Sequence, residues 1–175
     1  MHGTLDYALC AQHLTYAEIR LLGLLPEGFL RQARSFAVVR DPYSRILSSV
    51  LHFRAQVFLR IGLPELKSEE DLTKAIDVWL NLELEDHNFL AHRRPQSDFI
   101  TDLDGRIVVQ DLLRFERLAD EYYGLCQRLD LASPPLRKIG GRKVDKAGLP
   151  PLSQDARALV VEAFRRDFDI LGYPT

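Results

Sequence analysis

Apolar residues recur at helical spacing in five stretches of this chain, and capping residues mark where several stretches begin. Thr15 followed by Glu18 forms a capping-box pattern, and Ser68 and Ser153 are N-cap candidates. The helices expected from these signals cover 15–25, about 43–60, the segment from Ser68 through Trp79, 116–129, and the segment after Ser153.

Each later helix carries an apolar stripe that predicts which side chains face the core. These side chains are Tyr43, Ile46, Leu47, Val50, Leu51, Val57 and Phe58; Leu72, Ala75, Ile76 and Trp79; Leu118, Ala119, Tyr122, Leu125, Cys126 and Leu129; and Leu159, Val160, Ala163, Phe164 and Phe168.

Two short apolar runs predict strands. The run 35–39 reads as a short buried strand, and 106–110 is a second candidate. The polar stretch 87–104 is typical of a loop, and its Asp104-Gly105 end is a turn signal. The proline-rich and glycine-rich stretch 133–151 predicts a long loop. The whole pattern indicates an α/β fold with more helix than strand.

Composition narrows the classes of protein that remain. A chain of 175 residues, 46% hydrophobic and 27% charged, predicts one globular domain over 1–175. A net charge of −2 argues against a general nucleic-acid binder. Two cysteines are too few for a disulfide framework, and no stretch reaches the roughly 20 apolar residues of a membrane span. With no signal-like N-terminus, we expect a cytoplasmic protein without a membrane span; a homo-oligomer is compatible with the sequence.

The most informative stretch runs from Phe36 to Ser49. A strand leads into Arg40, a turn-forming Asp41-Pro42 follows, and a helix then opens, so N–H groups and the positive helix end face one point. The planar fork of Arg40 suits phosphate, and Ser48 could add a hydroxyl two helical turns later. The alternative is an ordinary strand–turn–helix joint whose arginine extends to solvent.

The pattern R-D-P-x-x-R-x-x-S resembles the 3′-phosphate-binding motif of sulfotransferases. Later segments are similar to those of the carbohydrate-type (Golgi-type) sulfotransferases, the family that includes the heparan 2-O- and chondroitin enzymes. The matching residues are Arg40, Asp41, Pro42, Arg45 and Ser48; His92-Arg-Arg-Pro95-Gln96; the segment from Ile107 through Arg114, Glu116 and Leu118; and Asp167-Phe168 with Gly172-Tyr173. In order and spacing the resemblance covers residues from about 10 to 173.

The resemblance implies a P-loop-NTPase-like sulfotransferase fold, with a short parallel sheet flanked by helices. It implies an enzyme that moves a sulfuryl group from 3′-phosphoadenosine 5′-phosphosulfate, without a metal, to a hydroxyl of a carbohydrate-like or other small acceptor. Arg40, Arg45 and Ser48 would bind the donor.

Two further roles follow from the resemblance, each with an open alternative. The segment Gln12-His13-Leu-Thr-Tyr16 is similar to the family's G-H-x-x-Y segment, which implies that His13 is the catalytic base. The alternative, given equal weight, is that His13 only packs against or caps the helix that begins at Thr15. Arg137 and Lys138, in a basic Gly-Gly loop, would fold over the donor, although a solvated charge run is the favoured reading.

One family element is missing from the sequence. The chain has no Lys-Thr-Gly-Gly-like run, which in the family grips the 5′-phosphosulfate. We therefore expect an N-terminally truncated domain that lacks the first strand and P-loop, exposes a sheet edge, and has doubtful activity. The alternative function is a non-catalytic nucleotide-binding module that keeps only the 3′-phosphate half-site.

The other polar candidates predict no further chemistry. His87 and His92 lie five residues apart in a polar stretch, without a spacing that supports zinc. Arg114 and Glu116 are expected to form a structural ion pair, and Asp167 to be structural.

Overall fold

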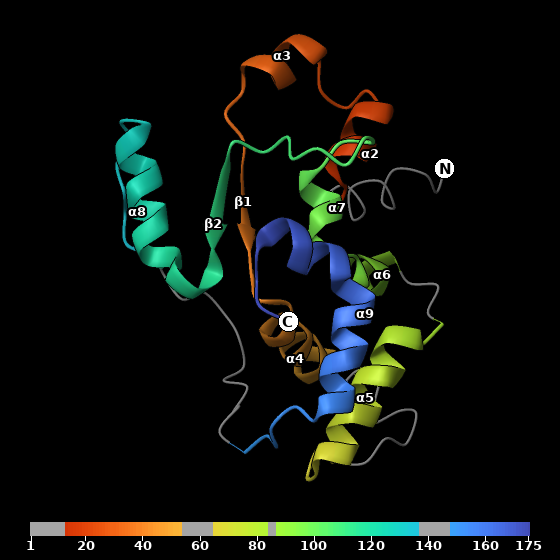
Figure 1. Cartoon of the computed structure of the whole chain (residues 1–175). Helices are drawn as coiled ribbons and strands as arrows, with labels where there is room; N and C mark the ends of the chain where they lie inside the picture. The colour runs from red at the N-terminus through yellow and green to blue at the C-terminus, as the bar shows by residue number, and fades with distance from the viewer. Residues whose placement is uncertain (1–12, 54–64, 84–86, 137–147) are drawn as a thin grey trace, which may run out of the picture.

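The structure is a computed structural model that describes residues 13–53, 65–83, 87–136 and 148–175. The fold is α/β and helix-rich, with one short parallel sheet (Figure 1). Its elements are α2 (Tyr16–Leu21), α3 (Glu27–Gln32), β1 (Phe36–Val39), α4 (Pro42–Phe53), α5 (Glu69–Asn81), α6 (His87–Arg93), α7 (Gln96–Ile100), β2 (Asp111–Arg114), the 3-10 turn η2 (Phe115–Arg117), α8 (Leu118–Arg128) and α9 (Gln154–Leu171).

The two strands run parallel, in a register that pairs Phe36 with Asp111 and Val39 with Arg114. Their carboxyl ends therefore lie at the same edge of the sheet, where α4 follows β1 and η2 follows β2. In Figure 1, α8 lies beside β2, while α4, α5 and α9 gather beyond this edge. Ligands of open α/β sheets bind at the carboxyl ends of the strands, so a binding site is expected at this edge.

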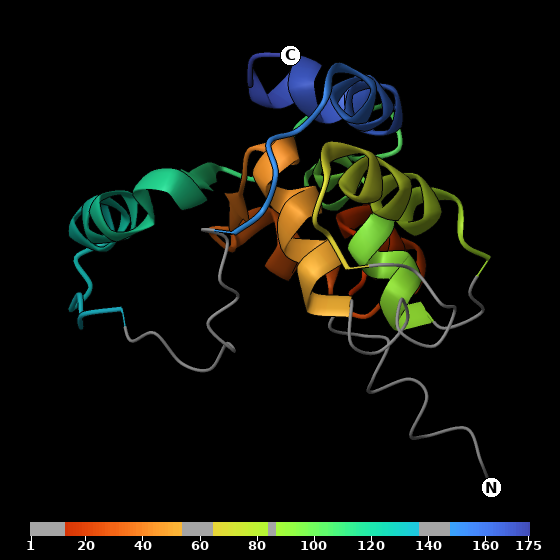
Figure 2. The same ribbon diagram turned by 90° about the horizontal axis from the view of Figure 1, so that it is seen from below.

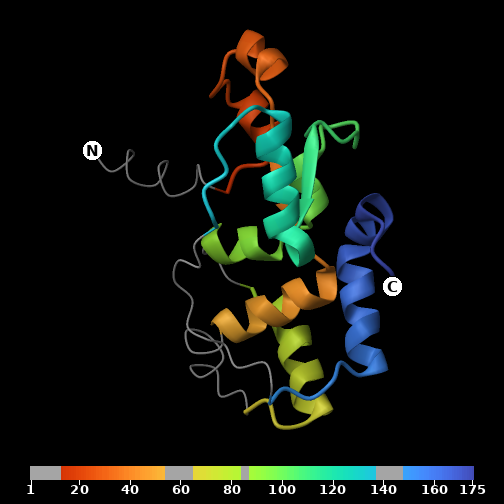
Figure 3. The same cartoon turned by 90° about the vertical axis from the view of Figure 1, so that its left-hand side faces the viewer.

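Helices α4, α5 and α9 pack side by side and form the main core (Figure 3). The four residues of α5 that were predicted to face inward are all buried. Of the described inward positions of α4, Tyr43, Ile46 and Val50 are buried, and Leu47 and Leu51 are partly buried against the core. A smaller cluster of Val39, Ile100 and Leu171 lies under the sheet. Figure 2 shows α5 and α9 from below, with α8 well apart from them.

The predicted helix starts are confirmed by their caps. Glu18 N donates to Thr15 Oγ1 at 3.1 Å while Thr15 N donates to Glu18 Oε2 at 2.8 Å. Ser68 forms the same reciprocal box with Asp71, and Ser153 accepts from Ala156 N. The first helix ends at Leu21 rather than at residue 25, because Gly23 takes a φ of +61° that favours glycine.

The prediction of a fully buried first strand is wrong. Val39 is 2% exposed, but Phe36 is 56% exposed and Val38 45%. A two-stranded sheet offers few neighbours, so the face of β1 that carries Phe36 and Val38 stays open.

The loop expected over 87–104 and the strand expected over 106–110 are also wrong. Helices α6 and α7 occupy most of the first stretch. The second strand instead begins at Asp111, because Ser35 O accepts the N–H groups of Gln110 and Asp111 and sets the register. Ile107 makes only an isolated antiparallel bridge with Thr101. The Asp104-Gly105 turn is confirmed, with Gly105 at a φ of +79°.

Two smaller predictions fail, and others fall outside the described residues. Ala119 and Ala163 are exposed. The buried stripe of α9 proceeds in steps of four residues and includes Asp167, which leaves Ala163 outside; α8 is buried only at Leu125 and Cys126. Val57 and Phe58 lie outside the described residues. Among the described helices, none has both the length and the apolar character needed to cross a membrane.

Candidate functional site

The turn between β1 and α4 is built by Asp41. Its Oδ2 accepts from Ser44 N at 2.7 Å, and its carbonyl accepts from Arg45 N at 2.9 Å, so Asp41 is the N-cap of α4. Pro42 occupies the first helical position, where a missing N–H costs little. This local chemistry turns the chain sharply at the sheet edge and leaves Arg40 at the end of the strand.

The Arg40 side chain lies between a ring and a hydroxyl. Its Nε donates to Ser44 Oγ at 2.5 Å, and its guanidinium carbon is 4.5 Å from the centroid of the Phe115 ring. Burial lowers the pKa of Arg40, whereas the negative charges of Glu116 and Asp41 act to raise it. Neither terminal nitrogen has a hydrogen-bond partner among the described residues. The fork is therefore held in place while its two outer nitrogens remain available for an anion.

The side chain of Gln96, at the start of α7, forms hydrogen bonds with the main chain of Arg40. Its Oε1 accepts from Arg40 N and its Nε2 donates to Arg40 O, both at 2.8 Å, as a neighbouring strand would. Asp167 in turn holds α7: its Oδ2 accepts from Gln96 N and its Oδ1 from Ser97 N, both at 2.8 Å. Asp167 is 0% exposed. A buried carboxylate on α9 thus positions the group that orients Arg40.

Glu116 performs a similar task from η2, the turn that follows β2. Its Oε1 accepts from Asp41 N at 2.8 Å and its Oε2 from Tyr173 Oη at 3.0 Å. Burial and the bond to Glu116 raise the pKa of Tyr173 to about 12. The expected Arg114–Glu116 ion pair is wrong, because Arg114 donates to Leu171 O at 2.7 Å and stacks on Tyr173 instead.

Arg45 and Ser48 lie apart from the contacts of Arg40. The Arg45 Nη2 donates to the carbonyls of His92 at 3.1 Å and Arg94 at 2.7 Å, so this arginine joins α4 to the end of α6. Burial lowers the pKa of Arg45, opposed by the charge of Asp167. Ser48 is half-buried and lies one helical turn beyond Ser44 on α4.

The hydroxyl that contacts Arg40 therefore belongs to Ser44, which the motif comparison missed. Its spacing of four residues from Arg40 was the available signal. Arg137 and Lys138 lie outside the described residues. No group of three or more metal-ligating side chains within the described ranges could hold a metal ion.

His13 is half-buried, and its ring meets two other histidines. Its centroid is 5.6 Å from that of His92, which is 6.5 Å from that of His52. Burial lowers the pKa of His92, and the charges of His13, His52 and Arg45 lower it further. His52 was missed, although it follows Ser48 by four residues on α4.

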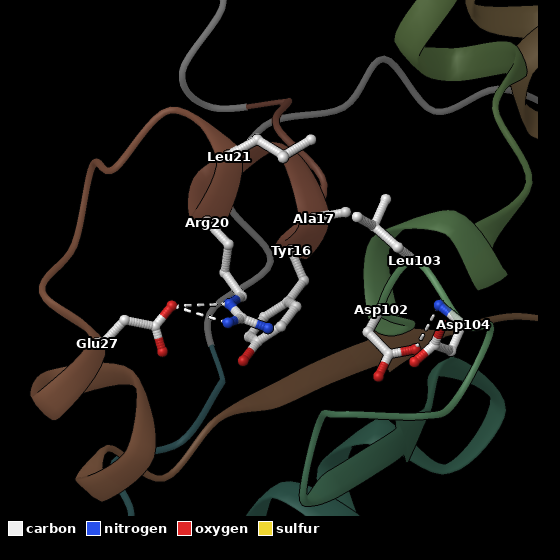
Figure 4. Close-up of a pocket in the computed structure, with 8 residues that line it drawn as sticks. All are labelled: Tyr16, Ala17, Arg20, Leu21, Glu27, Asp102, Leu103 and Asp104. Carbon is white, nitrogen blue, oxygen red and sulfur yellow. Dashed lines mark hydrogen bonds and ion pairs between the residues drawn. The ribbon is translucent and has the colours of Figure 1, made fainter.

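A separate pocket of about 340 Å³ lies between α2, α3 and the 102–104 turn (Figure 4). The Arg20–Glu27 ion pair crosses one side of it at 2.8 Å with Tyr16 next to Arg20, and Asp102 lies across from them. It lies at the amino end of β1, whereas Arg40 lies at the carboxyl end (Figure 1). No site residue expected from the sequence lines it.

Comparisons with protein-family models, with curated proteins and with solved structures found no match to this chain. The functional argument therefore rests on the site itself.

Proposed function

We propose that this chain is a sulfotransferase-type protein with a P-loop-NTPase-like sulfotransferase fold. It binds 3′-phosphoadenosine 5′-phosphosulfate through the 3′-phosphate. The reaction of this type of protein is transfer of the sulfuryl group to a hydroxyl of a carbohydrate-like acceptor, and we expect it to be slow in this chain, which has no Lys-Thr-Gly-Gly-like run for the 5′-phosphosulfate. One observation carries the proposal: the four segments that resemble the family meet at the Arg40–Asp41 turn. Gln96 binds Arg40 and Glu116 binds Asp41, with Asp167 and Tyr173 directly behind them.

The chemistry of the turn supports an anion as ligand. Arg40 offers two outer guanidinium nitrogens, and the positive end of the 12-residue helix α4 starts two residues later. Ser44 fixes the direction of the fork, and Ser48 extends the same polar face along α4. Planar, charge-assisted contacts of this kind favour a phosphate over a neutral group.

In the transfer step, the acceptor oxygen forms a bond to sulfur while the bond from sulfur to the 5′-phosphate oxygen breaks. The hydroxyl proton passes to a base, and 3′-phosphoadenosine 5′-phosphate leaves. We assign the base to His13, because a neutral imidazole suits this task near neutral pH. Arg45, Arg137 and Lys138 remain candidate donor ligands.

The test is calorimetric titration with 3′-phosphoadenosine 5′-phosphate. Arg40→Ala should weaken binding by about 1.5–3 kcal/mol, the usual range for a hydrogen bond to a charged group. Arg165→Ala, which removes an exposed arginine from α9, is the matched control and should bind like the unaltered chain. Equal affinity of the Arg40→Ala variant would refute the assignment.

A second function is favoured by a sequence observation, the absence of a Lys-Thr-Gly-Gly-like run. In that case the chain is a non-catalytic module that keeps the 3′-phosphate site. Binding that depends on Arg40, combined with no transfer to any acceptor, would favour this module over the enzyme.

A further inference from the structure

Three histidines from separate parts of the chain meet near the end of α4. His13 precedes α2, His52 lies in the last turn of α4, and His92 lies in the last turn of α6. Their ring centroids are 5.6 Å apart for His13 and His92, and 6.5 Å apart for His52 and His92. We call these three residues the histidine cluster.

An aromatic wall supports the cluster from one side. The Phe53 ring meets His52 edge-on at 4.7 Å and His92 at 5.0 Å. Phe53 itself stacks on Trp79 at 4.8 Å, and both are buried in the main core. The central imidazole, His92, is therefore held against a rigid surface, whereas His52 is exposed and open to a ligand.

The groups that act on the central ring of the cluster are basic. The groups that act on His92 are His13, His52 and the Arg45 guanidinium, all of which are basic. The nearby carboxylate of Glu18 is already engaged, by Arg94 at 2.7 Å and by Thr15 N at 2.8 Å. Arg93 on α6 points its Nη1 to the carbonyl of Leu82 at 2.5 Å. Within the described part of the chain, no carboxylate accepts a hydrogen bond from any of the three rings.

Among the described residues, the three rings therefore have no acidic hydrogen-bond partner that would balance a positive charge. Protonating one imidazole disfavours protonation of the next, because like charges at this separation repel. A tetrahedral oxyanion beside the rings would remove that repulsion and accept hydrogen bonds from their N–H groups. Proton uptake and anion binding would then strengthen each other by the same factor.

We propose that the histidine cluster is a binding site for a sulfate or phosphate group, free or as the ester of a sugar, and that it takes this oxyanion together with protons. It is distinct from the Arg40 site, since His52 lies ten residues along α4 from Pro42, the first residue of the helix, or about 15 Å, and Arg40 precedes that helix. The cluster shares His13 with the proposed transfer step, but the inference goes beyond that function and stands without it, since it is argued from the ring geometry.

The test is titration of the full chain with sodium sulfate at about pH 5.5 and about pH 7.5, on either side of the usual histidine pKa. Binding is followed by calorimetry and by the imidazole C–H signals in NMR spectra. We expect binding at least about tenfold tighter at the lower pH, with shifts in the His92 and His52 signals. Glucose 6-sulfate in place of the free ion distinguishes the sugar ester from sulfate as the source of the oxyanion.

Variants locate the binding. His92→Gln and the exposed His52→Gln should each lower affinity at the lower pH by about tenfold. His92→Lys should restore binding and reduce its pH dependence, because the lysine stays charged. Arg40→Ala should leave this binding unchanged while weakening nucleotide binding, which separates the two sites. Equal affinity at both pH values, or unchanged binding in both glutamine variants, would overturn the proposal.

Discussion

The side-chain amide of Gln96 holds both main-chain hydrogen-bonding groups of Arg40, accepting from the N–H and donating to the carbonyl, each at 2.8 Å. The two residues are 56 positions apart in the chain. The amide thus pairs with Arg40 as a residue of a neighbouring strand would. This pairing fixes the backbone that carries the Arg40 guanidinium. The order of the proposed phosphate site thus depends on α7.

Gln96→Ala should lower both stability and nucleotide affinity. It leaves the N–H and C=O of Arg40 without their partners, which costs about 1–3 kcal/mol when such groups are buried. Urea unfolding measures the first effect and calorimetry with 3′-phosphoadenosine 5′-phosphate the second. The control is Gln127→Ala, which removes an exposed amide on α8 that donates to Tyr123 Oη, and for which we expect a change within about 0.5 kcal/mol. Identical results for the two variants would contradict the role of Gln96.

Asp167→Ala should destabilise the fold by about 1.5–3 kcal/mol or more, because it removes the charged acceptor for Gln96 N and Ser97 N. The effect should appear in the free energy of unfolding and as faster amide exchange at Ser97. Asp169→Ala alters an exposed carboxylate two residues later on α9 and should change little. Normal protection of Ser97 in the Asp167 variant would show that α7 does not need this cap.

Stability should fall in acid partly through Glu18. The hydrogen bond with Arg94, together with those from Thr15, lowers the pKa of Glu18 to about 2 from an ordinary 4.5. A lowered pKa stabilises the folded state above the unfolded pKa, and this contribution is lost as the pH falls from about 4.5 to about 2. Because the side chain is 32% exposed, water screening limits its size to about 1 kcal/mol. Glu18→Gln should flatten the acid limb of a stability profile, whereas Glu162→Gln, on the exposed side of α9, should leave it unaltered.

The 175-residue chain should show only slow sulfuryl transfer, because it has no Lys-Thr-Gly-Gly-like run to hold the leaving 5′-phosphate. The leaving 5′-phosphate needs donors aimed at it, and loss of one preorganised donor costs about 10²–10³ in rate. A radiolabelled-sulfate assay with a panel of glycan acceptors measures this. Robust turnover would contradict the expectation, and His13→Ala should then abolish it if His13 is the base.

The sequence alone determined the parts of this protein that depend on neighbours along the chain. The caps at Thr15, Ser68 and Ser153 were predictable, because each bonds a residue three positions away. The inward stripe of α5 followed from helical periodicity. The turn at Arg40–Pro42 could also be predicted, since its N-cap residue and its proline act on neighbouring residues.

Tertiary structure decided what depends on residues far apart. The polar stretch that reads as loop contains α7, because Asp167, 71 positions after Gln96, caps it. The second strand starts at Asp111 because the Ser35 carbonyl sets its register. Likewise, Gln96 binds the main chain of Arg40 from 56 positions away, and three distant histidines lie together. Periodicity and capping act over a few residues, whereas these contacts join segments that are far apart in the sequence, so no local pattern could specify them.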